Sequence, residues 1–150
     1  MKIPGYELYF AHMKTYAVID KMLPQTPIIQ VVLKGLTDFS HMMKVDSGAD
    51  FSLLSMEYFQ MFTNDSPESV ADTPIGGVGG GRTAKVISPI KAIIETENNY
   101  EVECNITVGF VEDSRYSMCG LLGRKGLFDK FTIAFQSYPN ECLYLQNNRI

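Results

Sequence analysis

The order of apolar and polar residues along the chain predicts a protein built mainly of β-strands. Residues 100–111 show the clearest alternation, because apolar side chains occupy every second position and polar ones lie between them up to Thr107. This segment is expected to form a strand with one dry face, made by Tyr100, Val102, Cys104, Ile106, Val108 and Phe110. Further apolar or alternating runs predict strands at 27–33, 39–46, 86–94, 131–135 and 142–145, with turn-forming residues between several of them.

Helical periodicity is confined to two short segments. Residues 55–62 place large apolar side chains at three-residue spacing behind Ser55, a candidate N-cap, and a second short helix is expected after Gly123. Residues 63–74 are rich in turn-forming and acidic side chains and are expected to form an exposed connection. Because the chain has no internal repeat and no linker, we expect residues 1–150 to form one all-β domain with a closed or folded-over barrel.

The composition excludes several classes of function. Of the 150 residues, 45% are hydrophobic and 20% are charged, which suits one globular domain with a sizeable core. The formal net charge of -4 leaves no basic excess for binding phosphates, so nucleic acid is not expected as a partner. The 3 cysteines are far apart and odd in number, so we expect reduced thiols and neither a metal nor another cofactor. Without an apolar run of membrane-spanning length or a signal-peptide stretch, we expect a cytoplasmic protein with no membrane partner.

A first motif places a carboxylate at the end of a predicted strand. The apolar run before Asp46 leads directly into Asp46, Ser47 and Gly48, so the chain is expected to turn sharply there, and Gly48 permits that turn. Ser47 offers a hydroxyl to a neighbouring backbone, and Ala49 is small enough for a ligand to come close. Since Asp, Ser and Gly are the commonest turn residues, this motif taken alone favours an ordinary strand-ending turn.

A second motif is a run of glycines at residues 75–83. Its spacing nearly matches a phosphate-binding loop, but Arg82 replaces the lysine, and residues 83–89 are typical of extended chain rather than of a helix. A dinucleotide-binding fingerprint also fails, because Arg82 stands where its third glycine belongs. A β-hairpin with an apolar tip at Val78 remains, suited to covering an extended peptide; a mobile surface loop is the alternative.

A third motif completes a resemblance to a known family. Leu121, Leu122, Gly123 and Arg124 place two apolar residues before a glycine and an arginine, and a short helix follows. In this order, the three motifs resemble those of the retropepsin family of aspartic proteases across about residues 27–146. The run Leu-Gly-Arg-x-Gly-x-Phe-Asp-x-Phe is similar to cellular prokaryotic members. The resemblance implies an all-β acid-protease barrel with a hairpin flap and one or two short helices.

The resemblance also implies a role for each motif. Asp46 would be the catalytic aspartate, with Ser47 and Gly48 completing the catalytic triplet. Leu121, Leu122 and Gly123 would pack beside the catalytic loop as its internal counterpart, and Arg124 would be structural, paired with Asp50. The residues implied to bind substrate are Ala49 and Asp50 after the turn and Gly76, Gly77, Val78 and Gly79 in the flap.

The chemistry implied by this family needs two carboxylates that share one proton. The chain has one Asp-Ser-Gly and no half-chain repeat, so a homodimer is expected to bring Asp46 and its mate together on a peptide or protein substrate. The alternative is a non-catalytic dimeric module of the same fold that binds a peptide or protein, because the extra glycines at 79–81 would loosen the flap. Residues 1–26 have no counterpart in the minimal viral enzyme and are expected to form either an extra core strand or a segment near the dimer interface or cleft.

Overall fold

The computed structural model of this chain describes residues 8–12, 27–76, 81–97, 100–136 and 142–148. The strands are β1 (Leu8–His12), β2 (Ile28–Lys34), β3 (Asp38–Val45), β4 (Ser52–Ser55), β5 (Asp72–Ile75), β6 (Arg82–Glu95), β7 (Glu101–Val111), β8 (Gly120–Leu122), β9 (Phe131–Gln136) and β10 (Cys142–Asn147). The helices are short: η1 (Met56–Met61), η2 (Pro67–Ser69), α1 (Arg115–Met118) and α2 (Leu127–Lys130). None of the helices in this described part has the length and apolar composition needed to cross a membrane.

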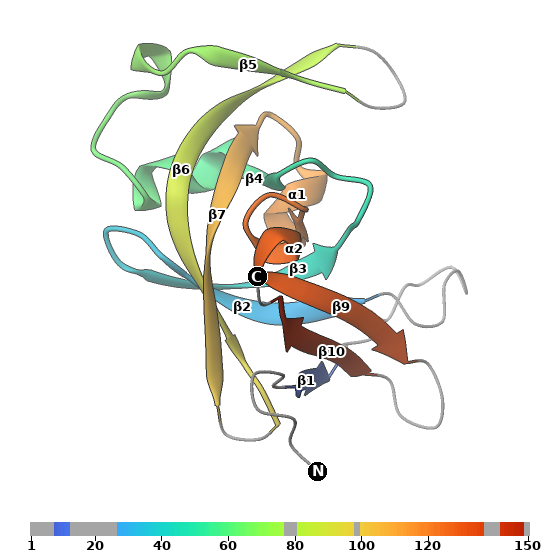
Figure 1. Cartoon of the computed structure of the whole chain (residues 1–150). Coiled ribbons are helices and arrows are strands. Elements are labelled where there is room, and N and C mark those ends of the chain that lie inside the picture. Colours follow the sequence, from blue (N-terminus) through green and yellow to red (C-terminus); the bar gives the residue numbers. More distant parts are fainter. Residues whose placement is uncertain (1–7, 13–26, 77–80, 98–99, 137–141, 149–150) are drawn as a thin grey trace.

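Six strands close into a barrel, and Figure 1 shows the long, curved strands β6 and β7 of its wall. The order of the six strands is β2-β3-β8-β4-β7-β6, and antiparallel pairing of β2 with β6 completes the ring, while β5 adds to the outer edge of β6. The pairs β3–β8 and β4–β7 are parallel, and the other pairs are antiparallel. The all-β barrel expected from the sequence is therefore confirmed.

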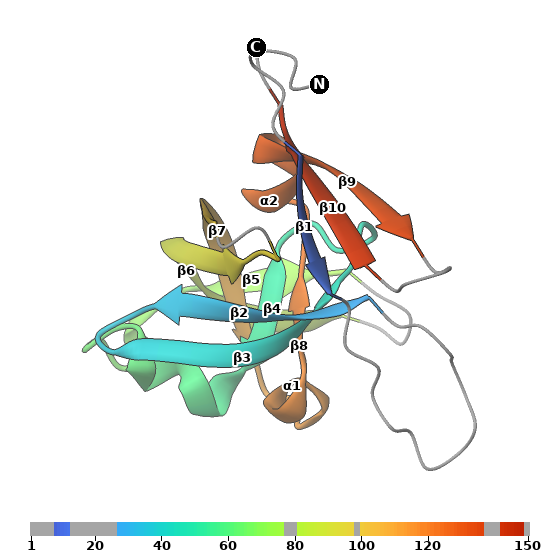
Figure 2. The same cartoon turned by 90° about the horizontal axis from the view of Figure 1, so that it is seen from below.

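A second sheet lies beside the barrel. It has three strands in the order β1-β10-β9, all antiparallel, and Figure 2 shows it on the side of the molecule that carries α2. Ala11 of β1 is buried in the main apolar core. Within the N-terminal segment, Leu8–His12 form strand β1, while residues 1–7 and 13–26 lie outside the described residues, so the two alternatives for residues 1–26 stay predictions.

The barrel interior holds the apolar faces that the sequence pattern predicts, with two corrections on β7. Val102, Cys104, Ile106, Val108 and Phe110 are buried as expected. Tyr100 is 55% exposed, because β7 begins only at Glu101 and the ring lies edge-on to Tyr9 instead of entering the core. Thr107 was expected to face solvent but is 7% exposed, and its hydroxyl lies 2.8 Å from the hydroxyl of Ser88 on β6.

Both predicted helices are found at the expected positions, but the first is a 3-10 helix. The segment at 55–62 forms the 3-10 helix η1, and Ser55 is buried and makes no capping hydrogen bond with its side chain. The helix expected after Gly123 is α2, whereas α1 was not predicted. Residues 63–74 are not all connection, because η2 and most of β5 lie within them.

Candidate active site

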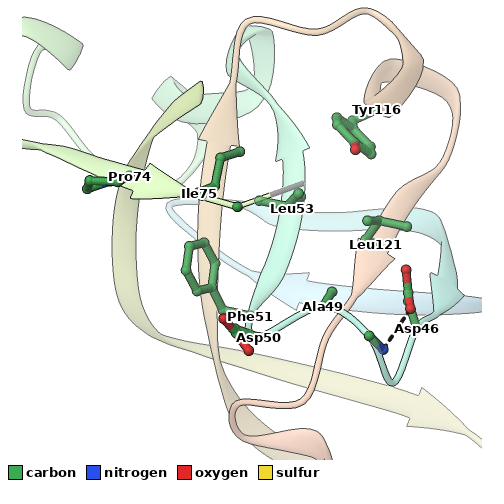
Figure 3. A pocket seen from close by; sticks show the side chains of 11 residues that line it. Asp46, Ala49, Asp50, Phe51, Leu53, Pro74, Ile75, Tyr116 and Leu121 are labelled. Atoms are coloured by element: carbon green, nitrogen blue, oxygen red, sulfur yellow. Dashed lines mark hydrogen bonds between the residues drawn. The ribbon is translucent and has the colours of Figure 1, made fainter. Parts of the chain in front are cut away.

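Strand β3 delivers Asp46 to a tight turn. The backbone N–H of Val45 donates to the carbonyl of Pro27 at 2.8 Å, and that of Asp46 donates to the carbonyl of Leu122 at 3.0 Å. Within the turn, the Gly48 N–H donates to the Asp46 Oδ1 atom at 2.9 Å (Figure 3). A Cβ atom at Gly48 would lie 3.2 Å from the same oxygen, which is a tight contact, so glycine lets the carboxylate cap its own turn.

The Leu-Leu-Gly motif lies next to this turn, as the resemblance implies. Strand β8 runs parallel to β3 with Leu122 opposite Val45, and it meets β4 where Leu121 lies opposite Leu53. Leu122 is fully buried in the barrel core, whereas Leu121 is half-buried and lines the cleft described below. The motif therefore separates into one core residue and one cleft residue by the alternation of a strand.

Backbone hydrogen bonds fasten the loop after β8 to the loop after Asp46. The N–H of Arg124 donates to the carbonyl of Ala49, and that of Lys125 donates to the carbonyl of Asp50, both at 2.9 Å. The Gly123 N–H donates to the buried hydroxyl of Ser52 at 3.0 Å. Because a Cβ atom on Gly123 would lie 2.4 Å from the carbonyl oxygen of Phe51, only glycine allows this approach.

The expected ion pair between Asp50 and Arg124 is present, and it is exposed. The Arg124 Nη2 atom donates to the Asp50 Oδ1 atom, but the two side chains are 54% and 79% exposed, respectively. Exposed pairs of this kind contribute under ~1 kcal/mol. In the single chain, the backbone hydrogen bonds, rather than this pair, hold the two loops together.

A cleft of about 430 Å³ opens beside the Asp46 turn. It is lined by Asp46, Gly48, Ala49, Asp50, Phe51, Leu53, Pro74, Ile75, Gly76, Tyr116 and Leu121 (Figure 3). The structure thus brings together the predicted residues Asp46, Gly48, Ala49, Asp50, Gly76 and Leu121. Ser47 is exposed in the turn and does not line the cleft, whereas the predicted residues Gly77, Val78 and Gly79 lie outside the described residues.

Several lining residues were not predicted as part of a site. Phe51 and Leu53 follow Asp50 closely, and Ile75 precedes the glycine motif. Their positions next to the predicted motifs could have indicated that they line the site. Tyr116 has no such signal, because it follows a strand far along the chain and reaches the cleft only through the placement of α1. Together with Leu121, these side chains belong to a small apolar cluster around Leu53, Ala84 and Val111.

Among the described residues, no group of three or more His, Cys, Asp or Glu side chains is placed to hold a metal ion. Cys104, Cys119 and Cys142 are free thiols. Cys104 is buried in the core, and this burial raises the pKa of its thiol to about 11, so it stays protonated at ordinary pH.

Comparison with solved structures supports the fold that the motifs suggest. The chain is similar to a retropepsin-like aspartic protease from Rickettsia conorii, with a TM-score of 0.58 and 16% sequence identity, covering 95% of this chain and 92% of that one. No protein-family model and no curated protein matches the chain. The likeness shows that this protein has the fold of a retropepsin-like aspartic protease.

Proposed function

We propose that this protein is an aspartic endopeptidase that completes its active site by homodimerisation, with Asp46 as the catalytic carboxylate of each chain. The observation that carries the proposal is the position of Asp46. Its carboxylate stands at the end of a barrel strand, at the edge of a cleft, and one of its oxygens is held by the N–H of Gly48. The shared fold with a retropepsin-like aspartic protease supports this choice over an ordinary turn.

The chemistry requires a second carboxylate that the described cleft of one chain does not offer. Asp50 is the other acidic residue that lines the cleft, and it is engaged with Arg124. A second copy related by two-fold symmetry would bring its own Asp46 to face the first. One carboxylate, ionised, would then take a proton from the attacking water, and the other, protonated, would donate a hydrogen bond to the peptide carbonyl.

The lining of the cleft suggests which peptides would bind. Phe51, Leu53, Ile75, Leu121 and Tyr116 present apolar or aromatic surface, so a side chain of an extended peptide would be recognised mainly by burial of its apolar area. The hairpin of β5 and β6 borders the cleft through Ile75 and Gly76. We infer that this hairpin is the flap, and that substrate would lie between it and the Asp46 turn.

Replacement of the catalytic carboxyl tests this function. Because Asp46→Asn removes the ionisable group with almost no change of shape, cleavage of a mixed peptide library should be lost, while circular dichroism and thermal unfolding should stay close to wild type. Asp38→Asn, at the opposite end of the same strand and paired with Lys34, is the matched control and should retain activity. Cleavage that persists in Asp46→Asn would remove the basis of the proposal.

The binding-module alternative has a different signature in the same experiment. A wild-type protein that binds library peptides in the cleft, yet leaves them intact across the pH range from acidic to neutral, would be a non-catalytic module of this fold. An inhibitor that mimics the tetrahedral intermediate adds a second criterion, since it should abolish wild-type cleavage if the paired carboxylates act on water.

A further inference from the structure

The half-buried carboxylate of Asp113 joins the β5–β6 hairpin to the loop that begins α1. Asp113 accepts a hydrogen bond from the backbone N–H of Arg115 at 3.0 Å, and the Arg115 guanidinium donates to it from Nη2 at 2.7 Å and from Nε at 3.1 Å. Arg82, the first residue of β6, donates to the same carboxylate through its Nη1 atom. The Asp113 side chain is 10% exposed, whereas those of Arg82 and Arg115 are 52% and 68% exposed.

This network joins the two segments that carry Ile75 and Tyr116, which line the apolar part of the cleft. Arg82 lies opposite Ile75 in the hairpin register, and Tyr116, which directly follows Arg115, donates its N–H to the carbonyl of Asp113 at 3.2 Å. Figure 3 shows Ile75 and Tyr116 on either side of Leu53. The Arg82–Asp113 ion pair therefore connects the segments that carry these two side chains.

We propose that the Arg82–Asp113 ion pair is a positioning contact: it fixes the separation of Ile75 and Tyr116 across the cleft, and so the size of the apolar substrate side chain accepted between them. The specificity role rests on the proposed peptidase function. The structural role, a tether between the hairpin and the loop before α1, does not depend on it.

Arg82 binds Asp113 from the hairpin, whereas Arg115 binds it from within the loop before α1. Substitution of Arg82 therefore removes the tether and leaves the Arg115 contacts. Hydrogen bonds from Arg115, and to a smaller extent the one from Arg82, hold the pKa of the Asp113 carboxyl well below its usual range, so the carboxylate stays charged at mildly acidic pH. Without Arg82, Asp113 keeps its hydrogen bonds to the backbone and guanidinium of Arg115. The start of α1 should then stay in place, and only the contact at the first residue of β6 is lost, because β6 remains paired with β7 from Lys85 onward.

The chain offers a matched control within the same hairpin. Lys85 of β6 pairs with Asp72 of β5 at 2.8 Å, and the Asp72 side chain is 59% exposed. Lys85 also donates to the carbonyl of Val70 at 2.8 Å, so it keeps one partner when Asp72 is neutralised. Asp72→Asn therefore removes an exposed ion pair from the hairpin without touching the tether.

Amide hydrogen exchange on the full chain tests the tether without any activity. In Arg82→Ala, amides of residues 72–76 and 82–84, the part of the hairpin that is not paired with β7, should exchange about two- to fivefold faster, the range expected for loss of one exposed ion pair, while those of 115–118 should be unchanged. Arg82→Lys, which keeps the charge, should restore most of the protection. Hairpin exchange that is the same in Arg82→Ala and wild type would overturn the tether.

Steady-state kinetics on peptides that differ only in one side chain, Ala, Leu or Phe, test the specificity role. In Arg82→Ala, the ratio of kcat/KM between the best and the worst of the three peptides should fall by roughly two- to fivefold, mainly through changes in KM. In Arg82→Lys, this ratio should return towards the wild-type value. Asp72→Asn should keep the wild-type preference. A uniform loss of kcat with unchanged preference would overturn the specificity role. If wild type cleaves none of the peptides, the proposed function fails, and the exchange experiment still decides the tether.

Discussion

The two oxygens of the Asp46 carboxylate have different surroundings. Oδ1 accepts the Gly48 N–H, and the described part of the chain donates no hydrogen bond to Oδ2. A carboxylate fixed by one oxygen keeps its orientation, while the other oxygen can share a proton with a second carboxylate or bind a water. A carboxylate with both oxygens hydrogen-bonded to the protein would have no oxygen left for a second carboxylate or a water. The arrangement at Asp46 therefore fits the proposed pair of carboxylates.

Asp50 and Arg124 illustrate how burial decides what an ion pair contributes. In the single chain both side chains are well exposed, so a double-mutant cycle of Asp50→Ala and Arg124→Ala, followed by urea unfolding, should give a coupling free energy under ~1 kcal/mol. The exposed pair Lys34–Asp38 is the reference and should give a similar value. A coupling of about 3 kcal/mol or more would contradict the exposed geometry and would show that the pair is desolvated when chains associate.

At the scale of elements, the loops around the cleft depend on close backbone approach at Gly123. A Cβ atom there would lie 2.4 Å from the carbonyl oxygen of Phe51, so Gly123→Ala should lower the free energy of unfolding by about 1–3 kcal/mol and displace the Asp46 turn. Gly81→Ala is the control, because a Cβ atom at that position meets nothing within 4 Å. Urea unfolding measures both; equal stability of the two variants would show that the loops separate easily.

The sequence predicts an element well when the residues of that element alone determine its structure. The alternation of apolar and polar residues within β7 is enough to predict this strand, and the prediction is correct to within one residue. Strand β5 was missed because Pro74 suggests a turn, yet proline is tolerated on an edge strand such as β5. Helix α1 was missed because its four residues have no apolar periodicity; the Asp113 side chain holds its first turn instead.

In the candidate site, too, features set by one short segment were predicted, and features set by distant segments were not. The Asp46 turn and the Gly123 loop were predicted from motifs, because each needs particular residues at fixed positions along one segment. Tyr116 and the exposure of the Asp50–Arg124 pair were not, because both depend on contacts between segments far apart in the chain. Barrel closure by pairing of β2 with β6 is equally non-local and was inferred only as one of two possible architectures.

At the scale of the whole molecule, the proposal requires association, since one chain places only one Asp-Ser-Gly carboxylate at the cleft. If the active form is the proposed homodimer, specific activity should be constant at high protein concentration and fall as the protein is diluted below the dimer dissociation constant, because a lone chain would supply only one of the two carboxylates. Analytical ultracentrifugation over the same concentrations should show the dimer fraction and the specific activity falling together.

Mixed dimers separate a shared active site from two independent ones. When a fixed amount of wild-type chain is mixed with excess Asp46→Asn chain and allowed to exchange subunits, most wild-type chains enter heterodimers that hold one ionisable carboxyl. Activity should then fall well below that of the same wild-type chain alone, towards zero as the excess grows, if both Asp46 side chains act on one substrate. Asp38→Asn chain in the same excess should cause no such loss, since its dyad is intact. Activity that stays constant under excess Asp46→Asn chain, with heterodimers demonstrated by ultracentrifugation of differently labelled chains, would show that each chain works alone.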